Sequence, residues 1–235
     1  MHADPVTRPR PTTLPVAAVL FDLDGTLADT AGDLALAVNR IRRDRGLDPV
    51  PIETLRPHAS AGARGLLGAG MGITPEHADY ALLRDEFLVN YAAGLAITTR
   101  LFDGVAALLR ELDARSLRWG IVTNKATRFT QPVVRALGLD AHAGAIVSGD
   151  TTPHPKPHPE PLLHAARLLE VDATRCVYVG DDLRDVIAGN AAGMPTIVAE
   201  YGYLGNSGSS DDWPATGWIA EPLALLSWLP PTPPD

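Results

Sequence analysis

Two aspartates stand two residues apart in the segment Asp22-Leu23-Asp24-Gly25-Thr26. Carboxylates this close repel one another unless a cation lies between them, and Mg²⁺ with oxygen ligands is the usual cation beside phosphate groups. Gly25 allows a sharp backbone turn, and Thr26 offers a hydroxyl and an N–H to an anion. The segment therefore indicates metal-assisted phosphate chemistry, although the pattern D-x-D-G is equally typical of a capped turn after a strand.

Polar residues also follow three later apolar runs, in the order Thr123 with Asn124, Lys156, and Asp181 with Asp182 and Asp185. Taken singly, Thr123 is typical of a strand end, Lys156 of a solvated side chain and Asp181 of a helix N-cap. If the runs are neighbouring parallel strands, their carboxyl ends meet at one edge of the sheet. The residues then supply the hydroxyl, cation and acids that phosphoryl transfer needs, because that reaction depends on positioning and charge stabilisation.

The elements that position these residues alternate along the chain. An apolar, β-branched run that starts at Val16 predicts the first strand, and later strands are predicted at 119–123, 145–148, 176–179 and 196–199. Helical spacing predicts helices at 105–114, 128–137, 159–169 and 183–192, and a last one from Pro222. This alternation predicts an α/β fold with a doubly wound parallel (Rossmann-like) sheet as its core.

The segment directly after the first strand has a different character. Residues 47–100 show no strand pattern, and helices are predicted from about Asp29 to Arg45 and at 52–57, 63–69 and 75–94. An all-helical insert at this point predicts a small cap domain over the carboxyl edge of the sheet. The expected division is a disordered tail at 1–15, an α/β core at 16–28 and 101–229, a helical cap at 29–100 and a Pro-rich tail at 230–235.

Composition limits the possible functions. The 235 residues are 46% hydrophobic and 20% charged, which is typical of a soluble globular protein, and the net charge of −8 argues against nucleic-acid binding. No apolar run approaches the roughly 20 residues of a membrane span. The single cysteine, Cys176, excludes an intrachain disulfide. We therefore expect a cytoplasmic protein, monomeric or homodimeric, with a small-molecule partner and no membrane or nucleic-acid partner.

The segment from Asp22 to Thr26 resembles the first motif of the haloacid dehalogenase-like superfamily, and the other three family motifs follow in order. The resemblance implies a Mg²⁺-dependent phosphatase that acts on phosphoric monoesters. In that family the first aspartate, here Asp22, is the nucleophile that forms an aspartyl-phosphate, and the second, here Asp24, is the acid and base. Thr123 and the Asn124 N–H would hold the phosphoryl oxygens, and Lys156 would neutralise charge on the phosphoryl group.

The same resemblance implies a ligand set for Mg²⁺. Asp22, Asp181 and Asp24, the last through its backbone carbonyl, would bind the ion. Asp182 or Asp185 would orient the waters on it. Thr26, with the residues named above, would contact the substrate phosphate.

The insert is similar to the cap of the phosphoglycolate phosphatase type. Within that type, the segment Ser60-Ala61-Gly62-Ala63-Arg64 is most similar to the N-acetylmuramic acid 6-phosphate phosphatases. Arg64 lies between two glycines and is expected to pair with a substrate carboxylate. N-acetylmuramic acid 6-phosphate and 2-phosphoglycolate both carry one, so Arg64 does not separate these substrates. A phosphomutase of the same fold that acts on a sugar phosphate is the alternative, and it would not release inorganic phosphate.

Overall fold

Six short parallel strands form the central sheet of the computed structural model, which describes residues 9–205 and 207–231. Their spatial order is β5-β4-β1-β6-β7-β8. Their bounds are β1 Ala18–Phe21, β4 Arg118–Val122, β5 Ala145–Val147, β6 Cys176–Gly180, β7 Thr196–Ala199 and β8 Gly217–Ile219. All four residues of β1 are buried, as expected for the centre of a sheet that is covered on both faces. The predicted doubly wound α/β fold is confirmed.

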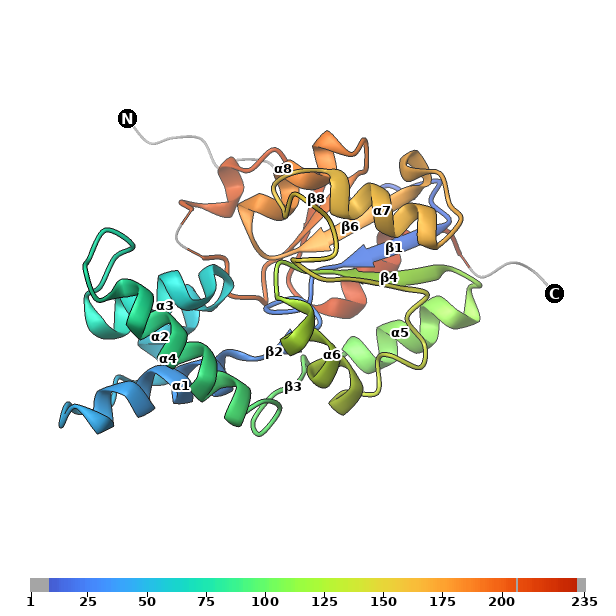
Figure 1. Cartoon of the computed structure of the whole chain (residues 1–235). Helices are drawn as coiled ribbons and strands as arrows, with labels where there is room; N and C mark the ends of the chain where they lie inside the picture. Colours follow the sequence, from blue (N-terminus) through green and yellow to red (C-terminus); the bar gives the residue numbers. More distant parts are fainter. Residues whose placement is uncertain (1–8, 206, 232–235) are drawn as a thin grey trace, which may run out of the picture.

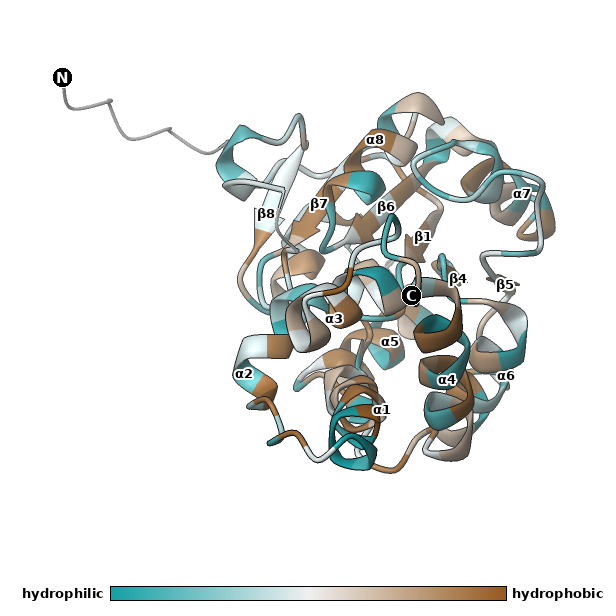
Figure 2. Ribbon diagram, turned by 60° about the vertical axis from the view of Figure 1, so that its left-hand side comes forward, coloured by the Kyte–Doolittle hydropathy of each residue, from teal (hydrophilic) through white to brown (hydrophobic). Residues whose placement is uncertain are grey.

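Helices cover both faces of this sheet (Figures 1 and 2). On one face lie α5 (Val105–Ala114) and α6 (Thr127–Ala136), and on the other lie α7 (Glu160–Leu168) and α8 (Leu183–Ala191). Side chains of β1 alternate between the two layers, since Val19 and Phe21 join the cluster of α5 and α6, whereas Ala18 and Leu20 join that of α7 and α8. The two apolar clusters hold the strand ends rigidly.

Strand β1 lies where the direction of the chain across the sheet reverses. Phe21, its last residue, is level with Ile121 of β4 on one side and with Val179 of β6 on the other. The chain runs outward from β1 to β4 and β5, then crosses to β6, β7 and β8. Ligands of open α/β sheets bind at such a switch point, beyond the carboxyl ends of the strands.

The segment after β1 is helical and has a hydrophobic core of its own. It contains α1 (Ala31–Asp44), α2 (Ile52–Leu55), the 3₁₀ helix η1 (Arg56–Ala61), α3 (Gly62–Met71) and α4 (Tyr80–Ala93). Val38 and Ile41 of α1 pack with Leu66 of α3 and Phe87 of α4. Figure 1 shows these helices gathered beside the sheet rather than on either face of it. The exact domain limits stay a prediction.

Some element boundaries differ from those predicted. The helix predicted at 75–94 begins at Tyr80, because residues 75–79 form turns in which the Asp79 N–H bonds to His77 Nδ1. The helix predicted at 52–57 becomes a 3₁₀ helix after Leu55, since Pro57 has no N–H for the α-helical ladder. The last predicted helix is the 3₁₀ helix η4 (Pro222–Trp228), and two further 3₁₀ turns are η2 (Ala173–Arg175) and η3 (Ser210–Asp212).

Residues 1–8 and 232–235 of the two predicted tails lie outside the described residues. Leu14 lies within the first predicted tail but is tied to the core, because its N–H donates to the Trp228 carbonyl at 2.8 Å. No helix in the described part of the chain is long and apolar enough to cross a membrane.

Two short strands that the sequence did not predict join the helical segment to the sheet. Strand β2 (Ala28–Asp29) pairs with β3 (Arg100–Leu101), so the chain leaves and returns side by side. Next to them, the buried Asp33 carboxylate of α1 accepts hydrogen bonds from the hydroxyls and N–H groups of Thr98 and Thr99. A strand of two residues is too short to show an alternation of apolar and polar residues, so the sequence pattern did not predict it.

Asp33→Asn is expected to lower the free energy of unfolding by about 2 kcal/mol, because hydrogen bonds to a charged group contribute roughly 1.5–3 kcal/mol and an amide accepts fewer of them. Burial raises the pKa of Asp33, but the bonds from Thr99 and Thr98 outweigh it and bring the pKa below its ordinary value of 3.8. The wild-type advantage is therefore complete above that value and is lost as the pH falls through the lower folded-state pKa.

Urea denaturation at about pH 7 and about pH 3 measures this difference. Asp44→Asn, at the exposed opposite end of the same helix, is the control and is expected to change little. An equal loss in both variants would contradict the assignment to Asp33.

Candidate active site

The turn after β1 places Asp22 at the switch point of the sheet. The Asp22 N–H donates to the Val179 carbonyl of β6 at 2.9 Å, and its Oδ1 accepts the Leu23 N–H at 2.7 Å. Gly25 follows with φ +85°, and a Cβ there would collide with the Asp181 carboxylate. Glycine is therefore required twice over at this position, for its backbone conformation and for the close approach of the turn to Asp181.

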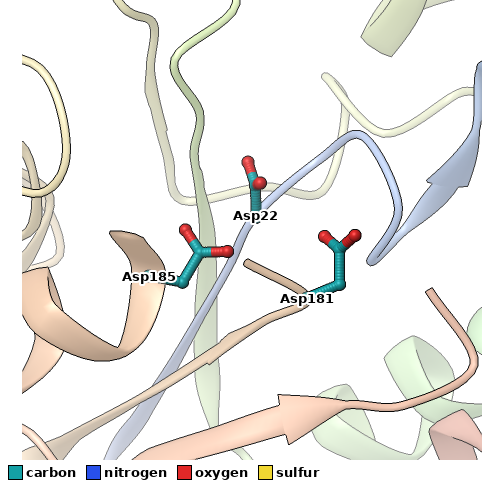
Figure 3. Close-up of side chains that lie close together, drawn as sticks. All are labelled: Asp22, Asp181 and Asp185. Carbon is teal, nitrogen blue, oxygen red and sulfur yellow. The ribbon is translucent and has the colours of Figure 1, made fainter. Parts of the chain in front are cut away.

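Three buried carboxylates converge beside this turn. Asp22, Asp181 and Asp185 each offer a carboxylate oxygen, and these oxygens all lie within 4.8 Å of one another. Figure 3 shows the three side chains gathered from the ends of β1 and β6 and from the first turn of α8. Gly180 makes room for this arrangement, because a Cβ there would collide with the Asp185 carboxylate.

The electrostatics of this acidic cluster leave a deficit of positive charge. Burial raises the pKa of Asp22 to about 6, and Lys156 opposes that rise. Burial, with the charges of Asp22 and Asp185, also raises the pKa of Asp181 well above its usual range. If all three carboxylates are ionised, the one ammonium of Lys156 leaves two negative charges uncompensated. Hard oxygen donors with this net charge fit one divalent cation such as Mg²⁺.

Lys156 is the buried cation of the site. Its Nζ lies 3.0 Å from Asp22 Oδ1 and 2.8 Å from Asp185 Oδ1, and it also donates to the Val122 carbonyl and the Tyr178 hydroxyl. Burial opposes its charge, but Asp185 and Asp22 raise the pKa of Lys156 above its ordinary value. The ammonium therefore stays charged and bridges β1, β4, β6 and α8.

The loops after β4 and β5 hold each other in register. The Asn124 amide donates to the Lys156 carbonyl at 2.8 Å, and its Oδ1 accepts the Lys156 N–H at 2.9 Å. The buried Thr123 hydroxyl accepts the Lys125 N–H at 3.2 Å. The side chain of Asn124 thus positions Lys156.

Asp24 lies apart from the three-carboxylate cluster. Its two carboxylate oxygens lie 2.9 and 2.8 Å from Lys125 Nζ, and Oδ1 also accepts the Thr30 hydroxyl at 2.6 Å. Burial lowers the pKa of Lys125, but Asp24 and Tyr91 more than reverse this and raise it above its ordinary value. A second buried ion pair therefore forms one wall of the site.

The helical segment contacts the site directly. The Ser60 hydroxyl donates to Asp181 Oδ2 at 3.2 Å, while Arg184 of α8 donates to the Ser60 carbonyl at 2.7 Å. Together with the sheet edge, the segment encloses a cavity of about 320 Å³. Asp22, Asp24 and Lys156 line one side of it, and apolar side chains such as Leu34 and Phe87 line the other. The cavity joins a charged floor to a largely apolar chamber.

Most of the predicted site residues meet here. The cavity is lined by Asp22, Asp24, Thr123, Asn124, Lys156, Asp182 and Asp185. The resemblance implied that Asp185, like Asp182, would orient waters on the ion. In the structure its carboxylate lies within the acidic cluster itself. The Asp182 carboxylate instead caps α8 and pairs with Arg184 at 2.8 Å. Thr26 is fully buried and donates to Asp181 Oδ1 at 3.1 Å, so its hydroxyl supports an acid rather than facing the cavity.

Arg64 does not reach the acidic cluster. It is exposed on α3 and lines a separate outer hollow with Glu76 and Leu183. The preceding residues Ser60 to Ala63 do line the central cavity. Helical rotation turns the next side chain, that of Arg64, to the other side.

Several residues of the site had no chemical role assigned from the sequence, among them Tyr178, Ser60 and Lys125. Tyr178, a partner of Lys156, lies inside an apolar strand, where a tyrosine is indistinguishable from ordinary core. Ser60 comes from the helical segment, and nothing in the residues around it indicated a contact with Asp181. Lys125 had a signal, since it directly follows Thr123 and Asn124 at a strand end.

Comparison with known proteins agrees with this geometry. Residues 16–193 match the family model of the haloacid dehalogenase-like hydrolases. The chain belongs to this family. The match confirms the predicted family and hydrolase class, and it spans all four motif-bearing strand ends of the haloacid dehalogenase-like core.

Named relatives resemble nearly the whole chain. A phosphoglycolate phosphatase from Xanthomonas campestris is 42% identical, with 91% of this chain and 95% of the relative covered. An N-acetylmuramic acid 6-phosphate phosphatase from Pseudomonas aeruginosa is 38% identical, with 90% and 94% covered. The crystal structure of CbbY from Rhodobacter sphaeroides in complex with phosphate has a TM-score of 0.70 at 24% identity and covers 89% of this chain and 96% of that one. This structural likeness supports the haloacid dehalogenase-like fold.

Lys156→Met is expected to lower the free energy of unfolding by about 3–5 kcal/mol at neutral pH, because it leaves buried carboxylates without their counter-charge. Since burial already raises the pKa of Asp22 to about 6, acidification protonates that carboxylate and the loss is expected to shrink at lower pH. Denaturation in EDTA across this pH range measures it. Arg110→Met, at an exposed position of α5, is the control, and a pH-independent loss would contradict this electrostatic account.

Proposed function

We propose that this chain is a Mg²⁺-dependent phosphatase that hydrolyses a small phosphomonoester through an aspartyl-phosphate on Asp22. The observation that carries the proposal is the position of Asp22. Its carboxylate lies on the cavity floor, 3.0 Å from the buried Lys156 ammonium and next to two further acids suited to a divalent ion. Family membership and phosphatase-named relatives support the same reaction class.

Two chemical steps follow from this arrangement. In the first, an Asp22 oxygen attacks phosphorus, the bond to the ester oxygen breaks, and Asp24 gives that oxygen a proton. In the second, Asp24 takes a proton from water while the water oxygen attacks phosphorus, which releases phosphate and restores the Asp22 carboxylate. Lys156, the Thr123 hydroxyl and the Asn124 N–H stabilise the charge on the phosphoryl oxygens in both steps.

Asp22, Asp181 and Asp185 are the side chains proposed to hold Mg²⁺, with the backbone carbonyl of Asp24 as a further ligand. When bound, the ion supplies positive charge beside the phosphoryl oxygens. The contact between Ser60 and Asp181 supports a role for residues 29–100 as a cap that excludes bulk water, over a core formed by 16–28 and 101–229. The cytoplasmic location and the monomeric or homodimeric state stay predictions.

Asp22→Asn is expected to lower kcat by about 10³-fold or more, because the neutral amide oxygen is a much weaker nucleophile than a carboxylate oxygen. EDTA is expected to abolish phosphate release in the wild type, and Mg²⁺ is expected to restore it. Turnover is measured as released inorganic phosphate. The aspartyl-phosphate on wild-type Asp22 is measured as one added phosphoryl group in the mass of the protein. Asp172→Asn, far from the cavity at a solvent-exposed turn, is the matched control.

Retained activity in Asp22→Asn, or full activity in EDTA, would contradict the proposed mechanism. Phosphoryl transfer between sugar phosphates without phosphate release would instead indicate the phosphomutase.

The substrate proposed is N-acetylmuramic acid 6-phosphate rather than 2-phosphoglycolate. Both are substrates named for relatives. The cavity of about 320 Å³ falls at the lower end of the size range for pockets that enclose drug-sized ligands, roughly 300–1,000 Å³. A sugar ring and an acetyl group can cover its apolar walls, whereas a two-carbon acid leaves them bare.

We expect kcat/KM for N-acetylmuramic acid 6-phosphate to exceed that for 2-phosphoglycolate by about tenfold or more, equivalent to about 1.4 kcal/mol of transition-state binding. Ala63→Leu narrows the cavity and is expected to lower kcat/KM for the sugar phosphate more than for phosphoglycolate. Steady-state kinetics with both esters tests this. A preference for phosphoglycolate that the variant leaves unchanged would overturn the choice of substrate.

A further inference from the structure

One buried hydroxyl in the cavity wall forms no hydrogen bond of ordinary geometry within the described part of the chain. Tyr91 of α4 is 2% exposed and lines the cavity. Among the described residues, no group accepts or donates a hydrogen bond at its hydroxyl within ordinary geometry. Its ring packs against Phe129 at 5.3 Å and Phe87 at 6.3 Å between centroids. Packing therefore explains an aromatic ring at this position, but a phenylalanine would satisfy it equally well.

The Lys125 ammonium lies against the Tyr91 side chain. Its Nζ lies 4.9 Å from the centroid of the Tyr91 ring. An ammonium has three N–H donors, and Lys125 directs its ammonium at both carboxylate oxygens of Asp24. Burial raises the pKa of Tyr91 to about 12 while Lys125 opposes the rise, so the hydroxyl keeps its proton at neutral pH.

Arg128 adds a second cation to the same wall. It lines the cavity, is exposed to solvent and lies with its guanidinium carbon 4.7 Å from the centroid of the Phe129 ring. No carboxylate oxygen of the described chain lies within 4.0 Å of its guanidinium, although side-chain hydrogen bonds and, to a smaller extent, its positive charge lower the pKa of Asp150. Lys125 is paired with Asp24, so Arg128 is the cation of this wall that has no ion-pair partner within 4.0 Å among the described residues.

We propose that Tyr91, Lys125 and Arg128 form a subsite for a carboxylate on the organic part of the phosphomonoester. All three groups donate hydrogen bonds and none is an anion, which matches an acceptor with two oxygens. A planar guanidinium can form two parallel hydrogen bonds with a carboxylate, which fits Arg128 to this role. The inference rests on the proposed phosphatase function, and it assigns to this wall the role that the sequence suggested for Arg64.

Tyr91→Phe tests the subsite with two matched pairs of esters. The first pair is 2-phosphoglycolate and 2-hydroxyethyl phosphate, and the second is N-acetylmuramic acid 6-phosphate and N-acetylglucosamine 6-phosphate. In each pair the second ester lacks the carboxylate. For each pair we divide kcat/KM of the ester with the carboxylate by kcat/KM of the ester without it. In Tyr91→Phe this ratio is expected to fall about tenfold, at least in the pair that the wild type hydrolyses faster. Tyr80→Phe, on the same helix outside the cavity, is the control and is expected to keep the wild-type ratio.

Arg128→Met is expected to lower the same ratio. Lys125 is left unchanged because it also holds Asp24. Titration calorimetry with the Asp22→Asn variant gives a readout without turnover: adding Tyr91→Phe is expected to weaken binding of the acidic ester about tenfold relative to the neutral one. Thermal unfolding provides the check on folding, since loss of an unpaired buried hydroxyl is expected not to lower Tm.

The outcomes separate the two proposals. Phosphate release with unchanged ratios in Tyr91→Phe and Arg128→Met would overturn the carboxylate subsite and leave the phosphatase standing. A wild-type preference for a sugar bisphosphate over both acids would overturn it as well. No release from any of these esters by folded wild-type protein would overturn the proposed function itself.

Discussion

The site depends on one buried cation among carboxylates. Lys156 lies in contact with Asp22 and Asp185 and donates to groups of β4 and β6. Burial of an ammonium is unfavourable by itself, and burial of the carboxylates without it would be worse. Each charge therefore lowers the free-energy cost of burying the others. The arrangement requires several strand ends to be held together. The hydrophobic layers on both faces of the sheet provide that rigidity.

Electrostatic incompleteness is the second feature of the site. With all three acids ionised, the cluster carries two negative charges more than Lys156 compensates, and burial accordingly raises the pKa values of Asp22 and Asp181. Glycines at positions 25 and 180 allow the acids to approach where any side chain would collide with them. Such an arrangement suits the divalent cation and the phosphoryl group that we propose for it, as expected of a preorganised site.

The helical segment is coupled to this chemistry through Tyr203, in the loop after β7. Its N–H donates to Asp181 at 2.9 Å, while its hydroxyl accepts the N–H groups of Thr30 and Ala31 at the start of α1. One residue therefore contacts both the acidic cluster and the point where the chain enters the helices. Ser60 of the helical segment donates to the same Asp181 oxygen, Oδ2, so both residues help to set how the helical segment meets the sheet edge.

The sequence by itself determined the parallel α/β core, the helical insert and the four strand ends with polar residues, because apolar periodicity and strand-end position are local properties. It could not determine the direction of individual side chains. Only the tertiary structure decided that Arg64 lies outside the cavity, that Asp185 joins the acidic cluster and that Tyr91 brings an unpaired hydroxyl beside Lys125. These contacts join residues far apart in the chain, and their geometry follows from packing between layers, which no local pattern encodes.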